Sequence, residues 1–330
     1  MTKDIVQPNS DLPSGDPVPL PDVPTPTPQP QPFPLKALIQ ATPSNIDAFL
    51  AHLHRCLQTP SGIDALLLFL GYAARLSAAG LQTATGPAVQ RSARRLLAAI
   101  EALPPSATLV LSSRALLPSP SVALLLRLAR RLRAFSAMAS EIRAFMRLWG
   151  LLNMYFWARG LVLKRRAAAN LSSDEEKQKQ PKTDKIESAI AWAQLTACVA
   201  FQSLENGAFL AGKGVLEWSA ERTARTARWS ARFWGGFVGL EIARLLYEAH
   251  RRSRRTARER IGDKTVAEAE ADERAWSLQW RKTLLRNAAW APLTVHWSLE
   301  DGLLSDLAIG ALACIPGTLS IRDLWRRTAE

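Results

Sequence analysis

The sequence predicts an all-α, membrane-associated bundle of amphipathic and apolar helices that follows a disordered, proline-rich N-terminal tail. Apolar residues recur every three or four positions through most of the chain beyond the tail, a spacing typical of α-helices. The 330 residues include 42 Lys and Arg against 29 Asp and Glu, and the net charge of +13 indicates an anionic partner, either lipid headgroups or nucleic acid. Eleven tryptophans favour lipid, because indole rings accumulate at the headgroup level of a bilayer.

Composition divides the chain into four regions. Residues 1–34 form the tail, whose alternating prolines favour an extended polyproline II conformation; a PxxP ligand for an aromatic groove is the alternative to a plain disordered leader. Residues 35–170 form an N-terminal amphipathic helical region, and residues 171–187 form a charged linker. Residues 188–330 form a C-terminal apolar helical region that associates with a membrane.

Three helices are expected at the start of the N-terminal region. The first covers 45–57, the second 61–81 and the third 89–103. Pro87 separates the second from the third, because proline lacks the N–H group that a helix interior needs and its ring crowds the preceding turn.

The segment Ser121–Leu152 is the most informative helix of the chain. Its apolar side chains form one continuous stripe. The stripe consists of Leu125, Leu128, Leu132, Phe135, Ala139, Ile142, Met146 and Trp149. Five arginines flank the stripe: Arg127, Arg130, Arg131, Arg143 and Arg147. Glu141 is the one acid beside them. A wide apolar face beside a nearly all-positive face is typical of a helix that binds an anionic phospholipid membrane.

Two other interpretations stay open for this helix. Amphipathic helices commonly bury their apolar stripe in the core of a soluble protein and leave their arginines in solvent. Basic amphipathic helices also bind calmodulin-type partners. The three interpretations differ in what covers the stripe: a bilayer, the core of this chain, or another protein.

Three apolar helical stretches are expected in the C-terminal region, over 190–216, 233–247 and 303–321. Charged residues interrupt the first two, so neither is a clean membrane span. The interrupting residues are Glu205 and Lys213 in the first stretch and Glu241 and Arg244 in the second. The third is the best candidate for a span, because only Asp306 and Pro316 interrupt it.

The basic run His250–Arg260 lies between the second and third stretches. It is compatible with a nucleic-acid patch. The apolar helices on both sides favour a juxtamembrane loop instead, followed by a charged helix over 266–279. No nucleic-acid partner is therefore expected.

Motifs for catalysis or cofactor binding do not stand out, and we expect a protein that is not an enzyme and holds no cofactor or metal. The sequence contains no GxxxxGK[ST], GxGxxG or GxSxG motif. His52, His54 and Cys56 are close in sequence, but no second cluster completes a zinc site. Cys198 and Cys314 lie far from Cys56 and in apolar contexts, which indicates reduced thiols.

The order of several motifs resembles the peroxin-eleven family of peroxisomal membrane proteins, in particular its divergent members in filamentous fungi. The family's opening helix, in which an acid precedes a run ending in tyrosine and arginine, is similar to SGIDALLLFLGYAARL over 61–76. Its arginine–leucine segment is similar to EIRAFMRLWGLL, and Glu205-Asn206 takes the place of its acid–asparagine pair. Its later apolar helices are similar to Arg232–Tyr247 and Gly302–Trp325. The proline-rich tail departs from the family pattern.

The resemblance implies a non-enzymatic protein of the peroxisomal membrane that inserts amphipathic helices into one leaflet, self-associates and recruits organelle-fission machinery. Such a protein elongates and multiplies the organelle. Two other functions stay open. One is a membrane pore for ions or small metabolites, with Glu205, Glu241 and Arg244 along a polar path. The other is a soluble helical nucleic-acid-binding protein that uses Arg251–Arg260.

Overall fold

The structure is a computed structural model of the chain, and it describes residues 43–102, 119–171, 182–254 and 265–329. The described residues form helices and contain no strand, so the predicted all-α fold is confirmed for this part of the chain. The proline-rich tail, much of the charged linker and Arg255–Arg260 lie outside the described residues, and what the sequence predicts for them stays a prediction.

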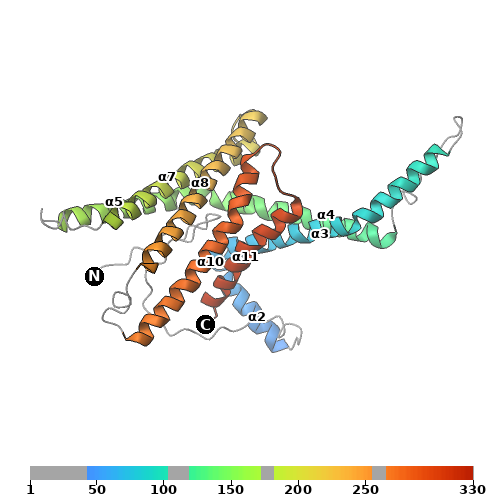
Figure 1. Cartoon of the computed structure of the whole chain (residues 1–330). Helices are drawn as coiled ribbons and strands as arrows, with labels where there is room; N and C mark the ends of the chain where they lie inside the picture. The colour runs from blue at the N-terminus through green and yellow to red at the C-terminus, as the bar shows by residue number, and fades with distance from the viewer. Residues whose placement is uncertain (1–42, 103–118, 172–181, 255–264, 330) are drawn as a thin grey trace.

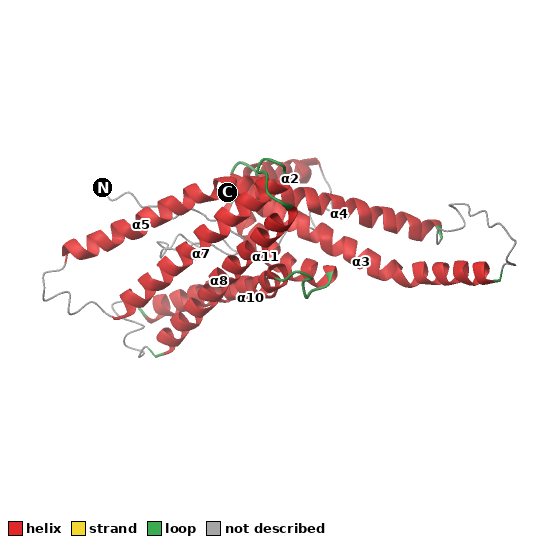
Figure 2. Ribbon diagram, turned by 90° about the horizontal axis from the view of Figure 1, so that it is seen from above, coloured by secondary structure: helices red, strands yellow, loops and turns green. Residues whose placement is uncertain are grey.

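Helices α3 and α4, α7 and α8, and α8 and α10 pack against one another, and α11 packs on α3 and α10. In order they are α2 (Pro43–Cys56), α3 (Pro60–Glu101), α4 (Pro120–Met146), the 3-10 helix η1 (Arg147–Trp149), α5 (Gly150–Leu171), α7 (Lys182–Gly212), α8 (Ala220–Ser253), α10 (Val266–Ser298) and α11 (Asp306–Arg327). Helices α3 and α4 project together from the rest of the molecule (Figure 1). Helices α4 and α5 continue one another along one side, whereas α8 and α10 occupy the other side (Figure 2).

Helix α3 runs through Pro87 to Glu101, so the prediction of two separate helices is wrong. Pro87 removes one N–H group, which would otherwise donate to the carbonyl of Thr83. Helix α4 packs along α3, and Arg133 Nη2 donates to Gln82 Oε1 at 2.6 Å close to the proline. The buried residues of α3 end at Thr85, so the helix continues past Pro87 with side chains that are exposed or half-buried.

Several other helices extend beyond their predicted ends. Helix α7 begins at Lys182, inside the predicted linker. Helix α8 begins after the cap residue Ser219, well before the predicted apolar stretch. Helix α10 begins at a capping box of Thr265 and Glu268 and continues to Ser298, beyond the predicted charged helix. The starts of α8 and α10 carry local polar caps, which apolar periodicity does not report.

The hydrophobic core joins the N-terminal and C-terminal regions. Its buried members come from α3, α5, α7, α8, α10 and α11: Leu68, Met154, Leu195, Cys198, Phe201, Trp234, Phe237, Val238, Trp290, Leu293, Ile309 and Ala313. Helix α11 lies against α3 at Gly310 and Gly317. A Cβ atom added to Gly310 would lie 2.8 Å from the Leu76 Cα atom, so the two backbones approach closely there. Small residues at such a crossing are common between membrane helices.

Two helices of the described chain, α3 and α11, are long and apolar enough to cross a membrane. Helix α11 coincides with the best span candidate that the sequence predicts. Helix α3 was assigned to the amphipathic region instead. In both helices, 39% of the most apolar window is buried inside the protein, so the structure leaves much of each available to a neighbouring surface.

Candidate membrane-facing surface

Most of the predicted stripe on α4 keeps part of its apolar surface exposed. Leu125, Leu128, Phe135, Ile142 and Trp149 are exposed, Leu132 and Met146 are half-buried, and Ala139 is buried. The helix packs on α3 through its buried residues Ala129, Ala139 and Arg143, and Ala139 is itself a member of the predicted stripe. A Cβ atom added to Gly71 of α3 would lie 3.2 Å from the Ala139 Cβ atom. Helix α3 thus covers Ala139 fully, whereas Leu125, Leu128, Phe135 and Ile142 keep 36–45% of their surface exposed.

The exposed apolar surface is longer than the predicted stripe, because it continues through η1 into α5. We call it the outer stripe, and it consists of Leu124, Leu125, Leu128, Phe135, Met138, Ile142, Phe145, Trp149, Leu152, Tyr155, Phe156 and Leu163. Aromatic rings continue it across the helix junction, where the ring centroids of Phe145 and Trp149 are 5.6 Å apart. At 1.5 Å per residue, the outer stripe extends about 58 Å from Leu124 to Leu163.

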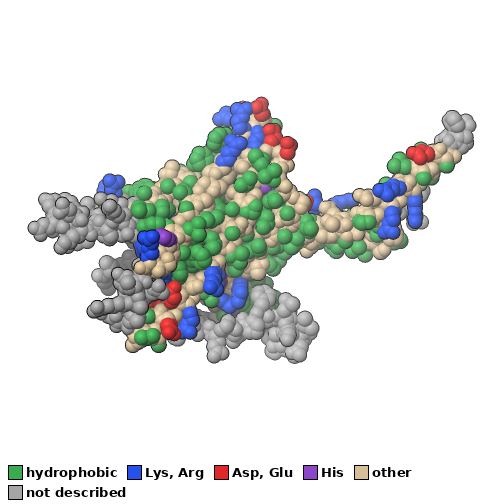
Figure 3. Space-filling view, in the orientation of Figure 1, with side chains coloured by type: hydrophobic (Ala, Val, Ile, Leu, Met, Phe, Trp, Pro, Cys, Tyr) green, Lys and Arg blue, Asp and Glu red, His purple; other side chains and the backbone are tan. Residues whose placement is uncertain are grey.

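The projecting part of α3 and α4 carries exposed positive charge. Six arginines are exposed there: Arg91, Arg94 and Arg95 on α3 and Arg127, Arg130 and Arg131 on α4. Basic side chains are visible along this arm in the space-filling view (Figure 3). The three arginines of α4 thus lie where the sequence predicts, beside the outer stripe and accessible to an anionic surface.

Arg143 and Arg147 do not belong to this cationic face, and the sequence-based assignment is wrong for both. Arg143 is buried and binds Asp64 of α3 through two hydrogen bonds, Nε to Oδ1 at 2.7 Å and Nη2 to Oδ2 at 3.2 Å. Arg147 binds Glu205 of α7 in the same two-pronged manner, at 2.9 and 2.7 Å. Two helix positions that look like solvated arginines in the sequence are therefore internal ion pairs between helices.

A polar cluster forms around the Arg147–Glu205 pair. Gln202 donates to Asn206 Oδ1 at 2.7 Å, and Asn206 Nδ2 donates to the Leu148 carbonyl oxygen at 3.2 Å. The motif residues that carry the family resemblance, which are far apart in the sequence, thus meet where α4 and η1 lie against α7. The sequence signal for these contacts is an acidic residue within an apolar helix, such as Asp64 or Glu205, together with an arginine on another helix that has no acid one helical turn away from it.

Other charged residues in the apolar stretches are paired in the same way. Glu241 accepts hydrogen bonds from Gln194 of α7 and from Arg244 one turn along α8, both at 2.7 Å. Asp306 at the start of α11 binds Arg75 of α3 at 2.6 Å and also contacts Arg133 of α4. Ion pairing inside the bundle lets ionisable residues occupy helices whose outer faces are apolar.

A second exposed apolar surface covers α8 and α10. We call it the back face, and its large side chains are Trp229, Phe233, Leu246, Leu278, Leu285 and Val295. The space-filling view looks at this side and shows apolar side chains over the middle of the body, with basic side chains at both ends of α8 (Figures 1 and 3). Leu246 and Leu285 are 55% and 49% exposed, so nothing in the described chain covers them.

Arg251 and Arg252 of the basic run and His52 of the histidine cluster make contacts within the described part of the chain. Arg251 pairs with Glu187 at 2.5 Å, and the Arg252 guanidinium pairs with Glu273 and lies 4.3 Å from the centre of a tryptophan ring. His52 stacks on Trp325 with ring centroids 3.7 Å apart, and burial is the main cause that lowers the pKa of His52. Within residues 43–102, 119–171, 182–254 and 265–329, no group of His, Cys, Asp and Glu has the geometry of a metal site.

The chain matches no protein-family model, no curated protein and no solved structure. The resemblance to the peroxin-eleven family therefore rests on the sequence motifs.

Proposed function

We propose that this chain is a non-enzymatic membrane-shaping protein whose outer stripe inserts into one leaflet of an anionic phospholipid membrane. One observation carries the proposal: twelve large apolar side chains along α4, η1 and α5 are exposed, while Arg143 and Arg147 pair inside the protein. An exposed apolar surface of this extent marks an interaction site on a protein or a membrane. The exposed arginines beside it favour a membrane with anionic lipid.

The length of the outer stripe favours an orientation along the membrane. A hydrocarbon core is about 30 Å thick, so a helix that crossed it would leave about half of a 58 Å stripe in water. A helix that lies in the membrane plane immerses the whole stripe below the headgroups. Helix α3 packs alongside α4 and takes the same orientation, so the inserted unit is a pair of helices and acts as a wide wedge in one leaflet.

Hydrophobic burial contributes more to this binding than charge does. Full transfer of one large apolar side chain from water is worth about 1.5–3 kcal/mol, and half-exposed side chains on the outer stripe contribute a corresponding fraction. Each of Arg127, Arg130 and Arg131 contributes about 1 kcal/mol near an anionic surface, and salt screens that contribution. Binding should therefore weaken at high salt without being lost.

The choice of organelle in this proposal rests on the family resemblance. We assign the protein to the peroxisomal membrane, where a wedge in the outer leaflet elongates the organelle before fission machinery divides it. Imaging a fluorescent fusion beside a peroxisomal marker tests this assignment. Colocalisation supports it, and a fusion found on another organelle would restrict the proposal to membrane shaping in general.

Self-association is assigned to the back face. The back face lies on the opposite side of the molecule from α4 and α5, so a second copy can bind there while the outer stripe is in the leaflet (Figures 1 and 2). Clustered copies place several wedges in one patch of membrane, and this concentrates the expansion of that leaflet.

The experiment that tests membrane shaping uses the full-length protein and giant vesicles that contain anionic lipid. The variant Leu128→Glu with Phe135→Glu introduces two carboxylates into the outer stripe at exposed positions, so the fold should persist. The matched control, Ala134→Glu with Ala137→Glu, adds the same charge to exposed positions on the same helix beside the stripe. We expect the wild type and the control to bind and deform vesicles, and the stripe variant to bind at least tenfold more weakly.

Equal deformation by the stripe variant and the control would contradict insertion of the outer stripe. Circular dichroism with thermal unfolding accompanies both variants. A loss of fold in the stripe variant alone would return the argument to the soluble-core interpretation.

A pore is supported less well by the geometry. Glu205 is paired with Arg147, and Glu241 is paired with Arg244 on its own helix, so the three proposed pore residues do not face a common opening within the described chain. Planar-bilayer conductance measures this alternative directly, and channel currents at single-molecule amplitudes would support it.

A further inference from the structure

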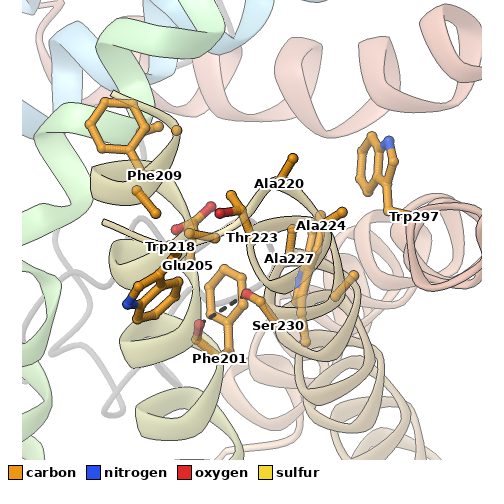
Figure 4. A pocket seen from close by; sticks show the side chains of 16 residues that line it. Phe201, Glu205, Phe209, Trp218, Ala220, Thr223, Ala224, Ala227, Ser230 and Trp297 are labelled. Carbon is orange, nitrogen blue, oxygen red and sulfur yellow. Dashed lines mark hydrogen bonds between the residues drawn. The ribbon is translucent and has the colours of Figure 1, made fainter. Parts of the chain in front are cut away.

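An open groove lies between the end of α7 and the first turns of α8, with a volume of about 720 Å³. Ala144 of α4 and Trp297 of α10 contribute to its lining, so four helices meet around it. The side chains of Phe201, Phe209 and Trp218 stand along the α7 side, and Trp297 stands across from them (Figure 4). The volume is within the range of ordinary small-molecule sites.

Small side chains of α8 create the open space. Ala220, Ala224 and Ala227 recur at four- and three-residue spacing and line one face of the helix, and Ser230 and Ala231 continue it. Ser230 does not offer its hydroxyl to the groove, because its Oγ donates to the Phe201 carbonyl oxygen at 3.0 Å. The Thr223 hydroxyl likewise donates to the Ser219 carbonyl oxygen, so the walls are largely apolar and suit a hydrocarbon chain.

The single charged lining residue is already neutralised. Glu205 lines the groove and binds Arg147 through Oε1 at 2.7 Å and Oε2 at 2.9 Å. This pairing neutralises the carboxylate, which would otherwise repel an anion. The charged side chains at the rim of the groove therefore determine whether an anionic or a cationic ligand is favoured.

The rim is cationic. The Arg222 guanidinium lies 4.3 Å from the ring centre of Trp218, a lining residue, so it stands at the edge of the groove. No carboxylate pairs with Arg222 within the residues that the structure describes. Nearby Arg228 has only a long contact of 3.7 Å to the exposed Glu300, and Lys213 pairs with Glu141. A tryptophan ring under an arginine is also the arrangement that membrane proteins use at headgroup level.

We propose that this groove binds one acyl chain of an anionic phospholipid, whose phosphate group contacts Arg222. The open side leaves the second acyl chain and the rest of the headgroup in the leaflet. Ala144 belongs to the helix that carries the outer stripe, so the groove reaches the part of the molecule that contacts lipid. The inference rests on the proposed function, because it requires a membrane to supply the lipid, and it adds a specific lipid class and a site.

The test uses the full-length protein purified in detergent, incubated with phosphatidic acid or with phosphatidylcholine and examined by native mass spectrometry for retained lipid. Ala224→Trp fills the groove at an exposed position, and Arg222→Gln removes the rim charge. The matched controls are Ala243→Trp, exposed on the same helix about 18 Å beyond Ala231, and Arg281→Gln, exposed on α10 about 24 Å from Trp297.

We expect the wild type and both controls to retain one phosphatidic acid in preference to phosphatidylcholine. Ala224→Trp should reduce retention at least tenfold for both lipids, because the tryptophan side chain occupies the space that the acyl chain would fill. Arg222→Gln should reduce retention of phosphatidic acid about fivefold and leave phosphatidylcholine unchanged. Equal retention by Ala224→Trp and Ala243→Trp would overturn the groove site, and equal affinity of Arg222→Gln and Arg281→Gln for phosphatidic acid would overturn the role of Arg222.

Failure of this proposal is distinguishable from failure of the proposed function. If the groove variants still bind and deform vesicles while lipid retention is unaffected by Ala224→Trp, membrane shaping stands and the groove proposal falls. Retention of a fatty acid but not of either phospholipid would also overturn the proposal, because the ligand would then be a single-chain acid.

Discussion

At the scale of single residues, charge pairing decides which side chains are available to a membrane. The sequence groups Arg143 and Arg147 with Arg127 and Arg130, because all four flank one apolar stripe. The structure separates them: Asp64 and an acid on α7 bind the first two, and the others stay exposed. A buried carboxylate and guanidinium are costly to separate, because either charge alone would remain in an apolar interior.

Removal of one partner of the Arg143–Asp64 pair should therefore destabilise the protein strongly. Asp64→Leu or Arg143→Met alone should lower the free energy of unfolding by about 3–5 kcal/mol, because each leaves one buried charge unpaired. The double variant should recover most of that loss, since no buried charge remains. Denaturant unfolding in detergent measures the three values, and a double variant no more stable than the single ones would show that the pair does not act as a unit.

The docking of α2 on α11 should depend on pH through His52. Burial is the main cause that lowers the pKa of His52 from 6.5, and the nearby Arg55 adds to it, while the hydrogen bond to the Trp325 carbonyl acts in the opposite direction. Because the pKa of His52 is lowered in the folded state, protonation of His52 favours release of α2 from α11. The contribution of neutral His52 to the stability of this docking is complete above about pH 6.5. It is lost as the pH falls toward the lowered pKa that His52 has in the folded protein.

Hydrogen exchange along α2 at about pH 7.5 and about pH 5.5, corrected for intrinsic rates, measures this dependence. The amides of α2 should exchange faster at the lower pH, and His52→Gln should remove the difference. Equal pH dependence in the variant would assign the effect to another group.

At the scale of helices, features that depend on local spacing could be predicted from the sequence, and features that depend on tertiary packing could not. The 3.6-residue period predicts the existence and the apolar faces of α4 and α11, because both follow from local spacing. Periodicity places Ala139 in the stripe but does not report that this member is fully buried against α3, because that contact depends on close approach at Gly71. The end predicted at Pro87 is wrong because proline removes one hydrogen bond of the helix, and α3 continues to Glu101 without it.

Pro87→Ala should stabilise the projecting end of α3. The new N–H group can donate to the carbonyl of Thr83, and alanine removes a penalty of up to about 3 kcal/mol for proline inside a helix. Amides between residues 88 and 101 should exchange more slowly with solvent than in the wild type, while amides of α11 should not change. Unchanged exchange beyond residue 87 would indicate that packing against α4 already fixes this end completely.

At the scale of the whole molecule, the outer stripe and the back face lie on opposite sides of one bundle and carry separate tasks in this account. The sequence predicts the stripe in outline, since its residues are consecutive in one helix. The back face was not predicted as a unit. Its side chains come from α8 and α10, two helices that are separate in the sequence and meet through tertiary packing.

The two surfaces should fail independently. Leu246→Glu with Leu285→Glu should reduce the oligomeric state measured by light scattering in detergent and leave vesicle binding close to that of the wild type. Leu128→Glu with Phe135→Glu should do the reverse, with the oligomer retained and vesicle binding reduced at least tenfold. Loss of both properties in either variant would mean that one surface serves both tasks.

The central claim is that lipid covers the exposed apolar surface, and flotation of the purified full-length protein with vesicles in about 1 M salt tests it most directly. At that ionic strength the Debye length is about 3 Å, so the attraction of Arg127, Arg130 and Arg131 to headgroups is screened and only hydrophobic burial remains. The account predicts that the protein needs detergent to stay monodisperse in water and floats with the vesicles after the salt is raised. A protein that is monodisperse without detergent and stays at the bottom of the gradient would contradict it.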